Sequence, residues 1–129
     1  MNVKNVEIKT KGKLYNNYFI GLNKTQKNIM TIVLQLMEKD LNTITFLGDT
    51  LKEIMDKTGY TENTIRKNLS LLYPLIEPTK QSTREYIVNP MFAIRGDEAK
   101  IWKMYGSIER SRGNKEATIL NKLEEDENE

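Results

Sequence analysis

Residues 61–72 carry side chains that are suited to contact nucleic acid. Counted at about 100° per residue, this stretch predicts a helix with polar side chains on one face, namely Asn63, Arg66, Lys67 and Ser70. The opposite face carries Ile65, Leu69 and Leu72, whose i, i+4, i+7 spacing is typical of a helix that packs on a core. The pattern therefore predicts an amphipathic helix whose outward face can meet a polar surface.

Each polar side chain of this helix has a chemistry that DNA can use. Arg66 is suited to a bidentate contact with guanine, Asn63 to one with adenine, and Lys67 to a phosphate. Thr61 is expected to cap the helix by accepting a hydrogen bond from the backbone N–H of Asn63 or Thr64. We include Thr61, Thr64 and Ser70 in the candidate DNA-binding set.

The residues before this helix complete a helix-turn-helix pattern. A shorter helix is expected over 49–57, capped near Asp49, with Leu51, Ile54 and Met55 facing inward. Thr58-Gly59-Tyr60 then forms a turn centred on glycine. In a DNA-binding helix-turn-helix the second helix enters the major groove. An ordinary pair of helices in a soluble protein has the same pattern, so this feature alone leaves DNA binding open.

The chain after this helix predicts two strands and a basic loop. Pro74 prevents the helix from continuing. A polar loop over 79–83 then precedes a strand over 84–90. The loop and its edge supply a second candidate contact set: Lys80, Gln81, Ser82, Thr83 and Arg84. In a winged helix this loop contacts the DNA backbone or minor groove, whereas in other proteins it is an ordinary exposed hairpin tip.

Four further elements are expected from local patterns. The stretches 3–9 and 14–20 flank a short polar link with glycine and predict a β-hairpin. A long apolar helix is expected over 24–39, followed by a short β-branched strand over 43–46. The last is a helix over 97–105, which Asp97 caps and Gly106 ends.

The chain contains neither cysteine nor histidine, which excludes several kinds of chemistry. Disulfides, Cys/His zinc sites and Ser-His-Asp triads cannot be built, and there is no P-loop or dinucleotide-binding glycine motif. The acidic residues outside the C-terminal end are scattered, so we expect no metal site. We predict a protein that is not an enzyme and that has no cofactor and no small-molecule substrate; an enzyme subunit remains an alternative.

The charge distribution is asymmetric along the chain. Residues 1–122 carry all 20 Lys and Arg against 13 Asp and Glu, a net charge of +7, whereas 123–129 carry five acids and no base. A basic body is typical of nucleic-acid binders, because phosphate contacts dominate their affinity. No stretch has about 20 consecutive apolar residues, and no signal-peptide pattern follows Met1, so we expect a cytoplasmic protein without membrane contact.

These elements predict an α+β fold, a winged helix-turn-helix with an N-terminal β-hairpin and a C-terminal helix. We expect one DNA-binding domain over residues 1–106 and a polar extension over 107–129. Within the extension, 114–123 has a weakly amphipathic pattern, and the acidic end over 124–129 is expected to be disordered.

One stretch resembles a known family. The order of elements, followed by Tyr86-Ile87-Val88-Asn89-Pro90 and then Met91 to Gly96, is similar to the RepL-type plasmid replication initiators of Gram-positive bacteria, which are winged-helix proteins. The resemblance covers roughly Tyr15 to Tyr105, and Asn89-Pro90 and Gly96 are its most specific positions. It implies recognition of sites in a plasmid origin or an associated control region.

The function expected from the residues and the resemblance together is sequence-specific binding of double-stranded DNA. We expect a homodimer on repeated or palindromic half-sites, with replication proteins as further partners. A winged-helix transcriptional regulator is an alternative. Another is a protein-interaction scaffold that holds its partner through Trp102, Tyr105 and the C-terminal amphipathic segment.

Overall fold

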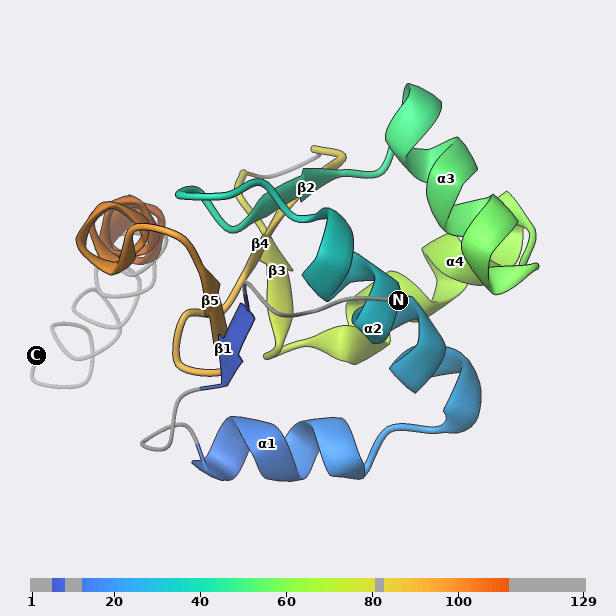
Figure 1. Cartoon of the computed structure of the whole chain (residues 1–129), viewed down its shortest axis with the longest axis horizontal. Helices are drawn as coiled ribbons and strands as arrows, with labels where there is room; N and C mark the ends of the chain where they lie inside the picture. Colours follow the sequence, from blue (N-terminus) through green and yellow to red (C-terminus); the bar gives the residue numbers. More distant parts are fainter. Residues whose placement is uncertain (1–5, 9–12, 81–82, 112–129) are drawn as a thin grey trace, which may run out of the picture.

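The fold is a mixture of helices and short antiparallel strands (Figure 1). The computed structural model describes residues 6–8, 13–80 and 83–111. No helix in these ranges combines the length and the apolar character that crossing a membrane requires. The α+β class expected from the sequence is confirmed.

The longest labelled helix, α2 (Lys24–Leu36), lies at the centre of the core. It begins at a capping box in which Asn23 and Gln26 exchange hydrogen bonds between side chain and backbone. Its buried residues are Ile29, Met30, Ile32, Val33 and Leu34. The expected apolar helix is therefore confirmed, but it ends at Leu36 because Met37 is extended and buried.

Three strands form an antiparallel sheet in the order β2-β4-β3: β2 (Thr43–Thr45), β3 (Ile76–Pro78) and β4 (Glu85–Val88). Ile44 lies opposite Tyr86, and Glu77 lies opposite Ile87. Strands were expected at 43–46 and 84–90, and both are present. The sheet separates α3 (Gly48–Thr58) and α4 (Glu62–Leu69) from the C-terminal helix (Figure 1). This arrangement is compatible with a winged helix.

The prediction of an N-terminal β-hairpin is wrong. Residues 13–20 form helix α1 (Lys13–Ile20), and β1 (Val6–Ile8) pairs instead with β5 (Ala93–Arg95). Tyr15, Phe19 and Leu22 have helical i, i+4, i+7 spacing, and all three pack on the core; the Phe19 ring lies 5.6 Å from that of Phe92. Aromatic residues also favour strands, so the local pattern suited both structures. Residues 3–5 and 9–12 of the expected hairpin lie outside the described residues.

The turn between α3 and α4 forms as expected, but the start of α3 differs. Gly59 has a φ of 75°, and its N–H donates to the carbonyl of Met55, which ends α3. Asp49 does not cap this helix: the N-cap position is Leu47, without a side-chain hydrogen bond, and Asp49 lies in the first turn. Gly48, with a φ of 56°, makes the bend that leads the chain from β2 into α3.

A C-terminal helix occupies 98–111 of the described residues (orange in Figure 1). Its expected cap is confirmed, since the N–H of Lys100 donates to Asp97 Oδ1 over 3.2 Å. Gly106 does not end it, because the helix continues to residue 111 and Gly106 has no positive φ. Residues 112–129 lie outside the described residues. The division into 1–106 and 107–129, and the expected structure of 114–123 and 124–129, stay predictions.

A buried asparagine joins the two sheets. Asn42 is fully buried with a φ of 59°, a conformation that asparagine tolerates better than most residues. Its Nδ2 donates to the carbonyls of Val88 and Ala93 over 3.2 and 2.8 Å. Its Oδ1 accepts a 3.0 Å hydrogen bond from the N–H of Arg95. One side chain therefore satisfies backbone groups at the end of β4 and in β5.

We predict that Asn42→Ala lowers the free energy of unfolding by about 2–4 kcal/mol, because buried backbone groups lose their partners. The measurement is urea denaturation at pH 7. Asn28→Ala is the control, since Asn28 is exposed and its side chain donates to the Tyr60 hydroxyl; it should change stability by about 0.5 kcal/mol or less. Equal stability of Asn42→Ala and the unmodified protein would contradict this role.

Candidate nucleic-acid interface

Helix α4 has the two faces that its sequence predicts. The residues expected in the core are buried: Ile65, Leu69 and Leu72. The residues exposed on the other face are Asn63, Lys67 and Ser70. The α-helix ends at Leu69, and a 3₁₀ turn, η2 (Ser70–Leu72), continues it. The outward face therefore presents one amide, one ammonium and one hydroxyl.

The two threonines of the candidate set help to build the start of α4. Thr61 Oγ1 accepts from the N–H of Thr64 over 3.3 Å, so the expected cap is confirmed. The Thr61 and Thr64 hydroxyls also lie 3.1 Å apart, within hydrogen-bond distance. The carbonyl of Thr64 accepts from Asn68, whose side-chain oxygen in turn accepts from Gln26 of α2. These contacts fix the first turn of α4 and link it to the central helix.

Arg66 has partners within the protein. Its Nε donates to Glu62 Oε2 over 2.9 Å, and its Nη2 donates to the carbonyl oxygen of Phe46 over 3.2 Å. Only 25% of its side chain is exposed. The guanidinium edge formed by Nε and Nη2 is thus already occupied. A bidentate contact between this edge and guanine, as expected from the sequence, would require Arg66 to leave both partners.

Phe46 joins α4 to the loop between β3 and β4. Its carbonyl accepts from Arg66, and its N–H donates to the carbonyl of Arg84 over 3.0 Å. Its fully buried ring packs edge-on against Tyr86 with a centroid distance of 5.2 Å. The backbone of one residue therefore links Arg66 of α4 to Arg84 at the base of the loop. The sequence does not reveal this link because Arg66 and Arg84 are both distant from Phe46 in the chain.

Electrostatics around Glu62 are consistent with this geometry. The hydrogen bond from Arg66 and its positive charge lower the pKa of the Glu62 carboxyl, and Arg84 adds a smaller effect in the same direction. The charge of Arg84 therefore acts on α4 from the base of the loop. The i, i+4 spacing of Glu62 and Arg66 is a sequence signal that could have identified the pair.

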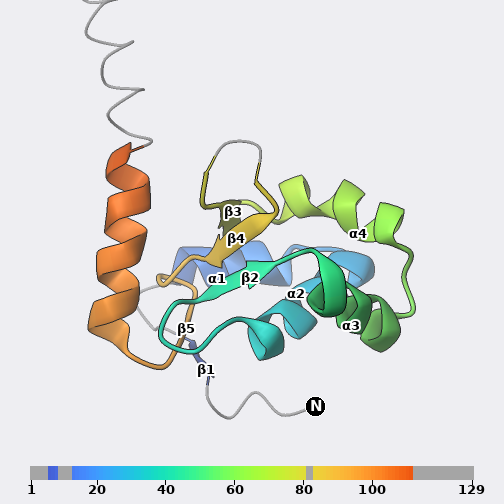
Figure 2. The ribbon, with the colours of Figure 1, turned by 90° about the horizontal axis from the view of Figure 1, so that it is seen from above.

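The loop residues divide into structural and exposed members. Thr83 Oγ1 accepts from the N–H of Glu85 over 3.1 Å, so its hydroxyl takes part in folding the loop. Lys80 and Arg84 are exposed, and they form no salt bridge within the part of the chain that the structure describes. Gln81 and Ser82 lie outside the described residues. Helix α4 and the described parts of the loop between β3 and β4, residues 79–80 and 83–84, lie along the same edge of the molecule (Figure 2).

The expected basic character is not concentrated on α3 and α4. Their bases are Lys52, Lys57, Arg66 and Lys67, and their acids are Asp49, Glu53, Asp56 and Glu62. Two of these bases form ion pairs along their own helix, Lys57 with Glu53 and Arg66 with Glu62. Within the part of the chain that the structure describes, Lys52 on α3 and Lys67 on α4 form no ion pair, and the loop adds Lys80 and Arg84. Phosphate contacts at this edge would therefore be few.

We predict that Arg66→Gln raises the pKa of Glu62 toward its ordinary value of 4.5, because the carboxylate loses its donor and its nearest positive charge. The pair stabilises the fold above about pH 4.5, and this contribution is lost as the pH falls through the lowered pKa. Carboxyl NMR titration measures the shift. Lys67→Gln is the control and should leave Glu62 unchanged; an unchanged Glu62 in Arg66→Gln would refute the pairing.

Among the residues that the structure describes, no group of three or more acidic side chains is placed to hold a metal ion. Comparison with protein-family models, with curated proteins and with solved structures gives no match.

Proposed function

We propose that the protein is a winged-helix protein that binds double-stranded DNA sequence-specifically. The order α2, β2, α3, α4, β3, β4, with β4 between β2 and β3 in the sheet, supports this proposal. In this order α3 and α4 correspond to the helix-turn-helix, and the loop between β3 and β4 corresponds to the wing.

The observation that carries the proposal is the shared edge of α4 and the loop. Asn63, Lys67 and Ser70 are exposed on α4, and the loop on the same edge carries exposed Lys80 and Arg84 (Figure 2). An α-helix fits the major groove of B-DNA, while an adjoining basic loop can reach phosphates. The hydrogen bonds of Phe46 keep these two contact sets in one relative position.

The geometry suggests a division of roles among the predicted residues. We assign base contacts to Asn63 and Ser70, and phosphate contacts to Lys67, Lys80 and Arg84. Arg66 acts as a positioning residue through Glu62 and Phe46, with base contact as its alternative role. Thr61, Thr64 and Thr83 support the local backbone, and Gln81 and Ser82 stay predicted contacts of the wing.

The biological setting follows from the resemblance to RepL-type initiators. We propose that the DNA site lies in a plasmid origin or its control region and that a homodimer binds repeated or palindromic half-sites. Replication proteins would be the further partners. Recognition of an origin and regulation of transcription would use the same surface, and the position of the selected site in natural DNA would distinguish them.

We predict that selection from random duplex DNA recovers a defined motif. Against that motif, Asn63→Ala should lose about 1–3 kcal/mol of discrimination at one base pair, because an amide that pairs with a base edge is removed. Competition binding with single-base variants of the motif measures the loss. Failure to recover any motif, or a loss spread equally over all positions, would contradict base recognition by Asn63.

Lys80→Ala should weaken binding to all sequences alike and reduce the salt slope of log Kd by about 1, because one phosphate contact is lost. Fluorescence anisotropy over a range of salt concentrations provides the measurement. Lys103→Ala is the matched control, since Lys103 is exposed on the C-terminal helix. Equal effects of the two substitutions would contradict a phosphate contact by the loop.

Two substitutions, compared with each other, distinguish a positioning role of Arg66 from direct contact with a base. If Arg66 positions α4, Glu62→Gln and Arg66→Ala should both weaken binding without changing the preferred motif. If Arg66 contacts guanine, Arg66→Ala should relax one base position, and Glu62→Gln should preserve or strengthen binding by releasing the guanidinium. The two motifs and affinities decide between these roles.

A further inference from the structure

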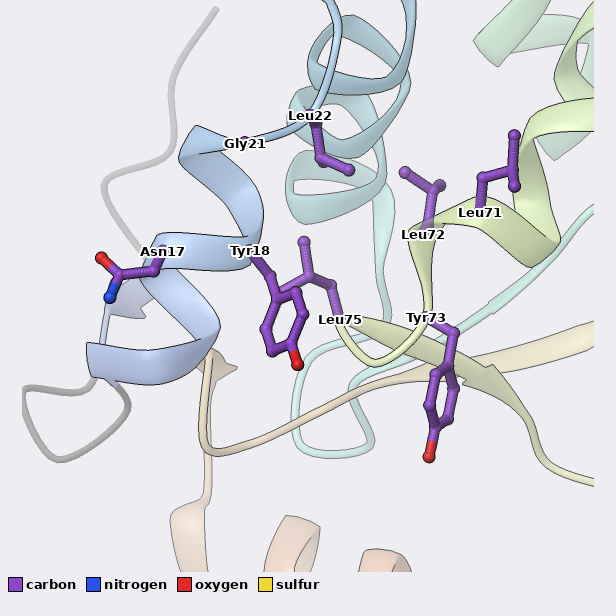
Figure 3. A pocket seen from close by; sticks show the side chains of 8 residues that line it. All are labelled: Asn17, Tyr18, Gly21, Leu22, Leu71, Leu72, Tyr73 and Leu75. Atoms are coloured by element: carbon purple, nitrogen blue, oxygen red, sulfur yellow. The ribbon is translucent and has the colours of Figure 1, made fainter.

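An apolar groove lies between α1 and the residues that follow α4. It has a volume of about 480 Å³ and is lined by Asn17, Tyr18, Gly21, Leu22, Leu71, Leu72, Tyr73 and Leu75. Figure 3 shows Tyr18 and Leu75 between the two walls, with Leu71, Leu72 and Tyr73 on the wall opposite α1. No function described above uses this groove.

Large apolar side chains are exposed at this place. Tyr18, Leu71 and Tyr73 all line the groove, and they are 48%, 58% and 62% exposed. The other exposed large hydrophobic residues in the described part of the chain, Ile20 and Leu47, do not line it. A cluster of this kind on a soluble protein is typical of a binding surface, because covering it removes apolar area from water.

The C-terminal helix passes near one end of this groove at Tyr105. Asn89 Nδ2 donates to the hydroxyl of Tyr105 over 3.1 Å and to the carbonyl of Pro74 over 3.4 Å, and Pro74 lies between two residues of the groove. From Tyr105 to Ser111 the helix rises about 9 Å. The eight residues from Ser111 to Ile119 can span up to about 26 Å when extended. This length is sufficient to return to the groove.

The remaining sequence has the chemistry that the groove requires. Ile119, Leu120 and Leu123 are apolar, and five acidic residues follow in 124–129. Lys67 and Leu71 are four positions apart, so this cation lies about one helical turn from the groove wall. An apolar segment in the groove would therefore bring the acidic end beside a cation of the candidate DNA-binding face.

We propose that the groove binds residues 117–123 of the same chain, with Ile119, Leu120 and Leu123 against its apolar walls. The acidic residues 124–129 then lie next to Lys67. This second step rests on the proposed function: the carboxylates occupy the position of DNA phosphates and weaken binding until the segment is displaced. The protein would thus carry its own competitor for DNA.

The first test is independent of DNA. The chain has no native cysteine, so Tyr73→Cys and Leu123→Cys in the full-length protein create a single pair for a short bis-maleimide crosslinker. We expect an intrachain crosslink, identified by peptide mass spectrometry, several-fold more abundant than with Leu47→Cys and Leu123→Cys as the control pair. Adding Leu120→Asp should reduce the crosslink to the level of the control.

Two outcomes would overturn docking in the same chain. An interchain crosslink would show that the groove takes the segment of a second copy. A yield equal to that of the Leu47 pair would show that the segment does not occupy the groove. Circular dichroism of the variants checks that α1 and α4 remain folded, so that loss of crosslinking reports on docking.

The second test measures the competition with DNA. Leu120→Asp should raise the affinity for duplex DNA several-fold at low salt and have less effect at high salt, because it releases the acidic end from Lys67. Asn121→Asp is the matched control, since it adds the same charge without removing an apolar contact. Equal affinities of the two variants would overturn the competition. A specific intrachain crosslink in a protein without DNA affinity would support docking and refute only the proposed function.

Discussion

The candidate binding edge depends on two hydrogen bonds made by the backbone of Phe46. Its N–H holds Arg84 at the base of the loop, its carbonyl holds Arg66 of α4, and its ring is buried against Tyr86. A buried ring of this size cannot shift without loss of core packing. The buried ring therefore positions the loop and α4, together with the hydrogen bonds that link α4 to Gln26 of α2. A ligand that contacts both the loop and α4 therefore meets two surfaces whose relative position is fixed before it binds.

A second polar anchor fixes the opposite end of the sheet. The buried side chain of Asn42 satisfies backbone groups of β4 and β5, and Arg95 donates from Nη1 to the carbonyls of Gln35 and Met37 at the end of α2. Buried carbonyls without partners are costly, so this guanidinium supports the early end of α2. The two cationic side chains Arg66 and Arg95 thus act inside the fold, although both count as basic residues in the sequence. Composition alone overstates the positive charge that such a surface can offer.

The distribution of charge and apolar area gives the surface a mixed character. On α3 and α4 bases and acids balance, so long-range attraction of DNA to these helices would be weak and short-range contacts would decide affinity and specificity. The apolar groove begins where α4 ends, at Leu71. Recognition of a polar partner and docking of an apolar segment would therefore take place at adjoining surfaces, and occupancy of one would affect the other.

The local sequence was sufficient to predict the helices and turns whose signals lie within a few neighbouring residues. The apolar stripe of Ile65, Leu69 and Leu72 predicted α4 and its exposed face, and Gly59 predicted the preceding turn. Both signals are local, because helical periodicity and the left-handed backbone conformation of glycine depend on neighbouring residues alone. Tertiary structure decided whether 14–20 became helix or strand, since its aromatic residues suit both. It also decided that β1 pairs with β5 and that Arg66 reaches Phe46, because these partners are far apart in the chain and meet only after the core has formed.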